Sequence, residues 1–591
     1  MNTTKEHLSE IRADLMGTML QDKEGPYWVT PYYDKATDTF PAREYNEIFN
    51  GNCGIALFFI ALFEAYHQQE DLALAKKIID RILKNDYIIQ PRFYGFYTGI
   101  TGLIYCLVRL YETANDEQYL KAALHLNDTH RNGISTDMKE MDLLSGAAGN
   151  LLVLTLLYHH TKEETVIEDI RILIHRFLND ARISTEGLKW DHSKLAYDSL
   201  TGFSHGASGI AYALMQVGTY FGYEGLIYLG SEALKYEMQY YDEQTSNWLD
   251  LRLGARRFNL PGGHTWELNV FLPELKSVNS WAHGAAGIGI ARRYAWSITH
   301  DPVYLDQYNT SIQKCLEDIN ARREDYTLCS GYAGMVTLLI KDKTAINKIA
   351  GDAAELYKRT GTYNTFTPAN SRDMGLLSGR SGIGYMLINI LTKGKMNNVL
   401  AIQLPPSKNK HAGHYTTKTV KEILYEKYYP RTYALLSKSS SIDLIRNVYS
   451  YEKLLRGIWQ QHKGYLCYYK MNDHLNKAAA QFNDEMLWTA VYVNAAHVRL
   501  VHTTFNPAEP SEGQGSFVVL VEMHSTGIRE LCVGKLTTLM ISNLNKALTA
   551  NELINRIAEE VKTDKQLIAE KVLTQLKELV KSRMVVYRMQ H

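Results

Sequence analysis

The chain has 591 residues, of which 45% are hydrophobic and 22% are charged, as in an ordinary folded protein. Its 64 basic and 64 acidic residues cancel, which excludes bulk electrostatic attraction as a reason to bind nucleic acid or an anionic membrane. No apolar run approaches the roughly 20 residues that span a bilayer, so we expect no transmembrane segment. The six cysteines are scattered without a CxxC pair, and the N-terminus lacks an apolar signal core, which favours a cytoplasmic protein with reduced thiols.

An internal repeat runs through the first 400 residues. The pattern G-x-x-G, followed by an apolar stretch, occurs seven times. Its copies begin at Gly51, Gly99, Gly146, Gly206, Gly284, Gly331 and Gly379. Subtracting the positions of successive first glycines gives spacings of 48, 47, 60, 78, 47 and 48. Because four of the six spacings agree within one residue, we interpret each copy as one structural unit.

Each unit predicts two helices. The stretch that follows the glycines, such as GIALFFIALFEAY, is apolar nearly all round, which is typical of a buried helix. Between the copies lies an amphipathic stretch, such as DLALAKKIIDRILK, which predicts a helix with one exposed face. Seven such hairpins predict a mainly α fold, an α/α toroid with an inner and an outer ring of helices over residues 1–400. An open α-solenoid is the alternative, and the apolar inner helices favour closure.

The residue before each first glycine is polar in all seven copies. Five are Asn, Thr or Ser, which predicts that they cap the helix N-termini. The other two are His205 and His283, and histidine is not a favoured cap. Because all inner helices of a toroid begin at the same end, we expect His205 and His283 to approach one shared cavity.

The series LLSGAAG, GFSHGASGI, SWAHGAAGIGI and LCSGYAG resembles the lanthionine synthetase C-like family, the LanC cyclases. The resemblance covers all seven repeats. It implies a toroid with a zinc ion at one end, where a peptide cysteine thiol adds to a dehydrated serine or threonine and closes a thioether ring. The metal would lower the pKa of the thiol, because the thiolate is the nucleophile. His205 and Asp142 match the family's active-site histidine and aspartate, and with His283 they are the predicted catalytic residues.

The zinc ligands that the resemblance implies are mostly replaced. Ala282 stands where the first cysteine is expected, Cys329 matches the second cysteine, and Ser330 stands in place of the histidine. A family arginine is replaced by Val278. We therefore predict no metal at the family site and no cofactor. The alternative is a rebuilt zinc site through Cys329, His283 and His205.

The two wide spacings, 60 and 78, flank the fourth repeat. The second contains YYDEQTSNWLDLRLGARRFNLPGGHTWELN, which lacks helical periodicity and predicts an insertion over one mouth of the barrel. His264 and Trp266, together with Trp281, are candidates to line a substrate channel. The alternative is that His264 and Trp266 simply pack the inserted loop.

The composition changes after the seventh repeat. A Pro-Pro pair and a basic stretch predict a linker that opens a helical connecting region of unknown role, residues 401–510. Residues 511–591 predict two strands, three helices and a final strand, a winged-helix plan. This part resembles the PqqD-like elements that recognise the leader of a precursor peptide by adding it as a strand. One alternative is a DNA-binding winged helix, which the acidic residues between the basic ones on the third helix disfavour, and another is a part that simply packs onto the toroid.

Two functions remain open from the sequence. The first is a zinc-independent cyclase of lanthipeptide-type maturation, with a precursor peptide as substrate and a dehydratase or another maturation enzyme as partner. The second is a non-catalytic scaffold that binds the leader and presents the precursor to partner enzymes. A toroidal glycosidase is disfavoured, because such an enzyme needs two acidic residues at the cavity mouth and we expect Asp142 alone to be placed there.

Overall fold

The computed structural model describes residues 2–194, 196–253, 272, 275–321, 325–363, 365, 372–407, 414–438, 440–461, 473, 475–495, 497–511, 517–524 and 527–589. Within these ranges no helix is both long enough and apolar enough to cross a membrane.

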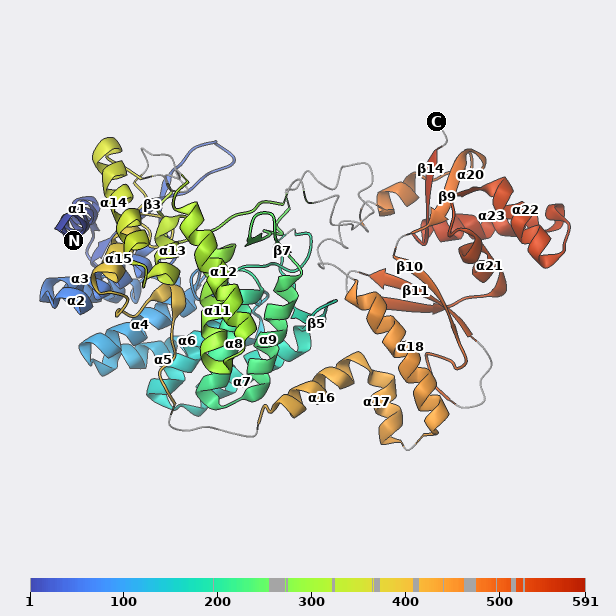
Figure 1. The fold of residues 1–591 in the computed structure, drawn as a ribbon, viewed down its shortest axis with the longest axis horizontal. Helices are drawn as coiled ribbons and strands as arrows, with labels where there is room; N and C mark the ends of the chain where they lie inside the picture. The colour runs from blue at the N-terminus through green and yellow to red at the C-terminus, as the bar shows by residue number, and fades with distance from the viewer. Residues whose placement is uncertain are drawn as a thin grey trace.

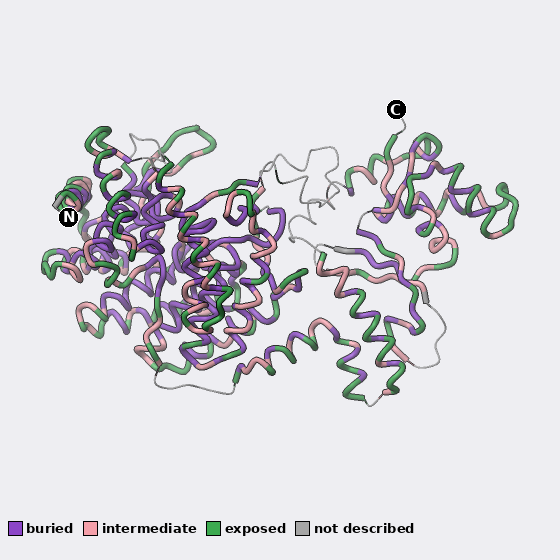
Figure 2. The backbone as a smooth tube through the Cα atoms, viewed as in Figure 1, coloured by how far each residue is buried: buried purple, intermediate pink, exposed green. Residues whose placement is uncertain are grey.

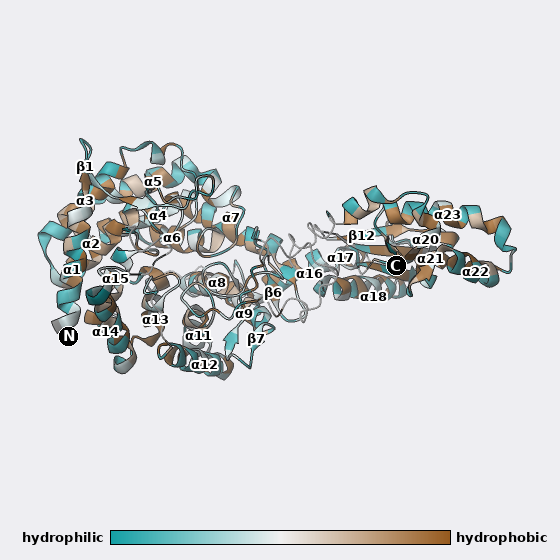
Figure 3. Ribbon diagram, turned by 90° about the horizontal axis from the view of Figure 1, so that it is seen from above, coloured by the Kyte–Doolittle hydropathy of each residue, from teal (hydrophilic) through white to brown (hydrophobic). Residues whose placement is uncertain are grey.

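Seven helices form a closed inner ring, as predicted. Each contacts the next in chain order, and the last contacts the first (Figures 1 and 3). Their middle turns are almost entirely buried (Figure 2), which explains why the sequence is apolar on every face. The inner helices are α2 (Asn52–Tyr66), α4 (Ile100–Ala114), α6 (Ala147–Thr161), α8 (Ala207–Phe221), α11 (Ala285–Thr299), α13 (Tyr332–Leu339) and α15 (Arg380–Leu391).

A second layer of seven helices surrounds the ring. Six of them directly follow their inner partners, and the N-terminal helix supplies the seventh by packing on α15. The two ends of the repeat region therefore meet and close the outer layer. The outer helices are α3 (Gln69–Ile82), α5 (Glu117–Arg131), α7 (Glu164–Asp180), α9 (Glu224–Met238), α12 (Pro302–Asp318), α14 (Lys343–Thr360) and α1 (Asn2–Thr18).

A closed ring of backbone hydrogen bonds ties the seven repeats together at the end where the inner helices begin. In each repeat, the residue two positions before the first glycine donates its N–H to the carbonyl of the corresponding residue in the next repeat, at 2.7–3.1 Å. The bond from Leu377 to Phe49 closes the circuit at 2.7 Å. The seven members are Phe49, Tyr97, Leu144, Ser204, Ala282, Cys329 and Leu377.

The glycines permit close packing at these helix starts. A methyl group on Gly287 would overlap the Trp281 carbonyl and the Phe203 side chain. The first glycine is itself the N-cap in every inner helix, without a side-chain capping bond. The predicted caps by the preceding Asn, Thr and Ser are therefore wrong. Aspartate side chains instead accept backbone hydrogen bonds within several of these loops. Asp142 Oδ1, for example, accepts from the Ser145 backbone N–H at 2.7 Å.

The segment that was expected to begin a linker instead fills the barrel centre. Residues 399–402 include the short 3-10 helix η5 (Val399–Ala401), and all four are buried. Tyr97 donates its hydroxyl to the Val399 carbonyl at 2.6 Å, and Trp281 donates its indole N–H to the Leu400 carbonyl at 2.9 Å. These bonds satisfy backbone groups that would otherwise be buried without partners.

Short elements decorate the toroid. The 3-10 helix η1 (Asp86–Ile88) and the π-helix η2 (Asn132–Thr136) follow outer helices. Two-stranded antiparallel ribbons fill the loops: β1 (Leu20–Gln21) with β2 (Pro26–Tyr27), β3 (Val29–Pro31) with β4 (Ala42–Glu44), β5 (Arg182–Ile183) with β6 (Leu188–Lys189), and β7 (Tyr241–Asp242) with β8 (Asn247–Trp248).

The first part of the connecting region is helical, with α16 (Thr417–Tyr428), α17 (Pro430–Ser437) and α18 (Ile442–Gln460), whereas its last part contains two strands. Helix α16 packs on α9 and α7 of the toroid. Lys427 donates to the Asn179 carbonyl at 2.6 Å, at the C-terminus of α7, where a cation also suits the helix dipole.

The C-terminal part holds the predicted elements but pairs its strands differently from the expected plan. The two predicted strands, β11 (Phe517–His524) and β12 (Gly527–Cys532), pair as a hairpin, and Thr549 and Glu552 form a capping box at the start of the second helix. The final strand β14, however, pairs with β9, which lies before residue 511, so the sheets cross the expected domain boundary. The elements are α20 (Met486–Thr489), β9 (Ala490–Asn494), β10 (Val498–Thr503), β11 (Phe517–His524), β12 (Gly527–Cys532), α21 (Lys535–Asn543), β13 (Leu548–Thr549), α22 (Ala550–Val561), α23 (Lys565–Lys581) and β14 (Val585–Met589).

Candidate functional site

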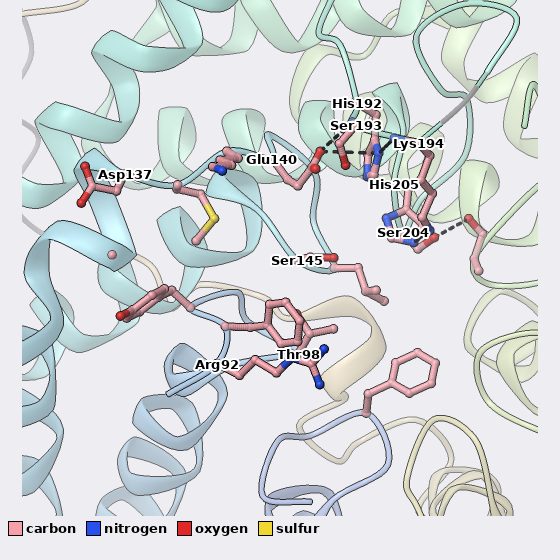
Figure 4. A pocket seen from close by; sticks show the side chains of 18 of the residues that line it. Arg92, Thr98, Asp137, Glu140, Ser145, His192, Ser193, Lys194, Ser204 and His205 are labelled. Carbon is pink, nitrogen blue, oxygen red and sulfur yellow. Dashed lines mark hydrogen bonds and ion pairs between the residues drawn. The ribbon is translucent and has the colours of Figure 1, made fainter. Parts of the chain in front are cut away.

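A cavity of about 1230 Å³ opens at the end of the barrel where the inner helices begin (Figure 4). It exceeds the 300–1,000 Å³ of a typical small-molecule pocket and offers room for several residues of a peptide. His205, His283, Cys329 and Ser330 line it, and so do residues of the first three repeats, including Arg92.

A buried carboxylate joins two histidines at one side of this cavity. Asp142, in the loop before α6, is 1% exposed. Its Oδ2 accepts from His205 Nδ1 at 2.6 Å and from His192 Nε2 at 2.7 Å. His205 directly precedes Gly206 at the start of α8, while His192 follows β6. The helix start therefore fixes His205, and Asp142 orients both rings.

The remaining ring nitrogens define the tautomers. His192 Nδ1 accepts from the backbone N–H of Lys194 at 3.0 Å, so the ring proton lies on Nε2, toward Asp142. His205 Nε2 lies 2.7 Å from the Lys194 ammonium, which can only donate, so the His205 proton lies on Nδ1. Figure 4 shows Lys194 and His205 side by side at the cavity. His205 thus presents a lone pair on Nε2, held by a cation.

Charge and burial set the protonation states. Burial alone would raise the pKa of Asp142, but the interaction with His205 and the hydrogen bonds from both histidines lower it well below the usual range. Burial lowers the pKa of His205, and Asp142 partly opposes this effect. At neutral pH the site therefore holds an ionised carboxylate and a neutral imidazole, an arrangement that can accept a proton on His205 and stabilise the resulting imidazolium.

His283 and Cys329 lie in the same cavity. The His283 and His205 ring centroids are 6.1 Å apart, which confirms that the two histidines share one cavity. Burial lowers the pKa of His283 to about 3, and its Nδ1 has no hydrogen-bond partner among the described residues. Burial raises the pKa of Cys329 to about 12. A neutral imidazole and a protonated thiol therefore line the wall beside Ala282.

The channel residues expected from the sequence lie elsewhere or are not described. Trp281 is 0% exposed in the barrel centre, where it binds Leu400, and it does not line the cavity. His264 and Trp266 lie outside the described residues.

Among the cavity residues that the sequence did not indicate are His192, Lys194 and Arg252. They lie in the two extra-long spacings that flank the fourth repeat. An isolated β-bridge joins Ala196 to Arg252, and Tyr197 donates its backbone N–H to the Leu251 carbonyl at 2.8 Å, so the insertions pair with each other at the cavity. The extra length of these two spacings indicated insertions, but the repeat pattern did not indicate which inserted residues face the cavity.

A buried ion pair supports the loop that carries His205. Glu237 on α9 accepts from the Gly202 backbone N–H at 2.7 Å and from Arg292 Nη2 at 3.0 Å. Both side chains of this ion pair are 0% exposed. The pair links the outer helix α9, the inner helix α11 and the loop three residues before His205.

Comparison with known proteins agrees with this architecture. The family model described as lanthionine synthetase C-like protein matches residues 44–402, which is more than half of the chain. The chain belongs to the lanthionine synthetase C-like family. This result confirms the resemblance that the repeat motifs indicated.

The individual relatives share little sequence identity with this chain. The chain is 24% identical over 317 residues to the lacticin 481/lactococcin biosynthesis protein LcnDR2 of Lactococcus lactis subsp. lactis, covering 50% of this chain and 29% of that protein. It is 24% identical over 365 residues to glutathione S-transferase LANCL1 of Danio rerio, covering 58% of this chain and 82% of that protein. Nisin cyclase is a structural neighbour with 15% identity and a TM-score of 0.45, covering 64% of this chain and 92% of that one.

The residues at the family's implied zinc site do not fit a metal. Ala282 offers no donor atom. Ser330 uses its hydroxyl to donate to Asp325 Oδ2 at 2.8 Å, within its own loop. Cys329 is the one soft ligand left of the three, and an ordinary structural or catalytic zinc needs at least three protein ligands.

One group of three ligand-type residues does gather among the described residues: Asp142, His192 and His205. A histidine that binds a metal normally donates its other ring N–H to an acceptor. Here the outer nitrogens of both rings accept from Lys194, so the protons occupy the positions where a metal would have to bind. The hydrogen bonding therefore favours a protonated network over a metal at this group.

Proposed function

We propose that this protein acts in lanthipeptide-type peptide maturation and adds a cysteine thiol to a dehydrated serine or threonine without the family's zinc site. The observation that carries the proposal is the Asp142–His205 pair, at family-matching positions in a cavity large enough for a peptide. The names of the two relatives support the two parts of this proposal: one acts in lacticin and lactococcin biosynthesis, and the other is a glutathione S-transferase, an enzyme that acts on a thiol.

The chemistry needs one proton transfer in each direction. The thiol proton passes to His205 Nε2, and the sulfur forms a bond to the β-carbon of the dehydrated residue. The π electrons of the double bond move toward the α-carbon and its carbonyl. His205 then returns the proton to the α-carbon, so the reaction is redox-neutral and releases no leaving group. Asp142 stabilises the imidazolium during this cycle, and its hydrogen bond keeps Nε2 directed at the cavity.

The test uses the full chain and a synthetic peptide with one dehydroalanine and one cysteine. Alkylation of remaining thiols followed by mass spectrometry measures ring closure. We expect closure above the buffer rate, and a fall of about 100-fold or more in His205→Ala, the usual contribution of a general acid or base. His125→Ala, an exposed histidine on α5 outside the cavity, is the matched control. A wild-type rate equal to that of buffer would contradict the enzyme.

We further propose that the C-terminal part recognises the leader of the precursor. On α23, the basic side chains that a DNA reader would need are partly engaged: Lys577 contacts Asp484 at 2.7 Å, and Lys581 lies 3.9 Å from Glu578. This engagement supports a peptide over DNA as the ligand. Titration of the full chain with the leader half and the core half of a precursor tests this, with a DNA duplex as comparison. Binding of DNA but not leader would reverse the assignment.

A scaffold that binds the precursor without chemistry is the second candidate. The observation that favours it is the loss of donor atoms at Ala282 and Ser330. In that case His205→Ala would leave the peptide product unchanged in the producing cell, while removal of the whole protein would abolish it. An altered product with His205→Ala would exclude the scaffold.

A further inference from the structure

The cavity has lost the donors for a metal cation, yet it contains a side-chain cation at the reacting group. Lys194 reaches the cavity from the first insertion and places its ammonium 2.7 Å from His205 Nε2. The Lys194 side chain keeps access to solvent, so an incoming group can reach it. The position is unusual, because an ammonium donates here to a neutral imidazole and not to a carboxylate.

Two other cations that line the cavity are neutralised. Arg252 binds Asp250 through Nε at 2.9 and 3.0 Å, and Arg131 binds Asp169 at 2.6 Å. Among the described residues, Lys194 has no ion pair within contact distance. Asp142 and Glu140 act on the Lys194 ammonium only from a distance, so its N–H groups stay available to an anion that forms during the reaction beside the catalytic imidazole.

We propose that Lys194 is a catalytic residue that binds the substrate thiolate and so takes the role of the missing metal cation. The inference rests on the proposed thiol addition. As the thiol proton passes to His205 Nε2, the Lys194 ammonium is displaced from that nitrogen and donates to the sulfur, so one N–H···N bond is exchanged for an N–H···S bond. After the sulfur has bonded to the β-carbon and His205 has protonated the α-carbon, Lys194 donates to His205 again.

Charged and titratable groups from the neighbouring elements act on Lys194 or on the His283 and Cys329 side chains that share its cavity. These charged and titratable groups are Asp142 and Glu140 from the loop before α6, His192 from the first insertion, His205 from the start of α8, Asp250 and Arg252 from the second insertion, His283 from the start of α11 and Asp325 from the loop before α13. Cys329 also lines the cavity, so its thiol can report on the charges there. Burial and Asp325 raise the pKa of the Cys329 thiol, whereas Arg252 and Lys194 lower it. A charge change at Lys194 should therefore be felt by a thiol in this cavity.

The experiment compares four full-length proteins: wild type, Lys194→Met, Lys194→Arg and Lys276→Met. Lys276 lies on the second insertion outside the cavity lining, so its variant removes the same charge from a neighbouring surface. The first readout is the rate at which iodoacetamide alkylates Cys329 at fixed pH, followed by peptide mapping. Because Lys194 acts on Cys329 less than burial, Asp325 and Arg252 do, we expect a rate about two- to threefold slower in Lys194→Met, with recovery in Lys194→Arg and no change in Lys276→Met.

The second readout is the pH profile of thioether formation between N-acetylcysteine amide and N-acetyl-dehydroalanine amide. In Lys194→Met the rising limb should move up by about one pH unit, and Lys194→Arg should restore it. Equal Cys329 rates in wild type and Lys194→Met, or equal slowing in Lys276→Met, would overturn the proposal. If wild type forms no thioether while Cys329 still responds to Lys194, the proposed function fails and the placement of the cation stands.

Discussion

Replacing His283 should make the toroid less sensitive to acid. His283 is 6% exposed, its Nδ1 has no partner among the described residues, and burial holds its pKa at about 3 against an ordinary value of 6.5. Between these two values the unfolded chain binds a proton that the folded chain excludes. Acid therefore favours unfolding, starting below pH 6.5 and reaching its full effect near pH 3.

The size of the effect follows from the separation of pH and pKa. At pH 5, about 1.5 units below its ordinary pKa, His283 binds a proton in the unfolded chain but not in the folded one. This difference lowers the free energy of unfolding by about 2 kcal/mol. Above pH 7 the contribution vanishes. We expect wild type to lose about 2 kcal/mol more free energy of unfolding than His283→Gln between pH 7 and pH 5.

Urea unfolding followed by tryptophan fluorescence is a suitable assay, because the buried Trp28, Trp190 and Trp281 all report on the toroid. His125→Gln is the control, since this side chain is exposed in the folded state and contacts water in the unfolded one. The reasoning is refuted if wild type and His283→Gln lose the same free energy between the two pH values.

Three further predictions concern stability and metal. Gly287→Ala should destabilise the toroid by about 3 kcal/mol, because its methyl group meets the Trp281 carbonyl. Gly351→Ala on α14, where the space is open, should be neutral or stabilising by about 0.5–1 kcal/mol. Equal effects of the two variants in urea unfolding would contradict this expectation. Tyr97→Phe should cost about 1–3 kcal/mol in the same assay by leaving the buried Val399 carbonyl without its hydroxyl donor, and an unchanged midpoint would show that another group replaces it. Treatment with a chelator should leave the melting temperature of the purified protein unchanged, as measured by calorimetry, and a clear fall would point to a bound structural metal.

The repeat pattern was enough to predict the toroid, because period, glycine position and apolar faces are local properties that the fold reuses seven times. The shared cavity of His205 and His283 followed from the same regularity. The prediction that Asn, Thr and Ser cap the inner helices was wrong, because the glycine itself is the N-cap. Asp142 and similar aspartates accept backbone hydrogen bonds within the preceding loops. Residues 399–402 resembled a linker because composition does not reveal that Tyr97 and Trp281 bond their carbonyls from inside the barrel.

The reactive cluster was only half predictable. Asp142 and His205 lie at repeat positions and could be matched to a motif. His192 and Lys194 lie in a loop without periodicity, and their place depends on how that loop pairs with the segment at Arg252. Long-range pairing of irregular segments is a property of the folded chain, so no local pattern could indicate it.

The closed circuit of seven backbone hydrogen bonds holds the backbone at the mouth of the barrel, whereas the chemistry of the site depends on the side chains. Ser204, Ala282 and Cys329 are consecutive members, and each joins the circuit through its peptide group, while Ser204 also donates its hydroxyl to the Ala282 carbonyl at 3.2 Å. A side chain can therefore be exchanged at such a position, even a metal ligand for a methyl group, while the spacing between neighbouring positions stays the same. At the circuit positions that line the cavity, such as Ser204, Ala282 and Cys329, a new reactive group can therefore be introduced without rebuilding the enclosure, and an insertion offers a second route.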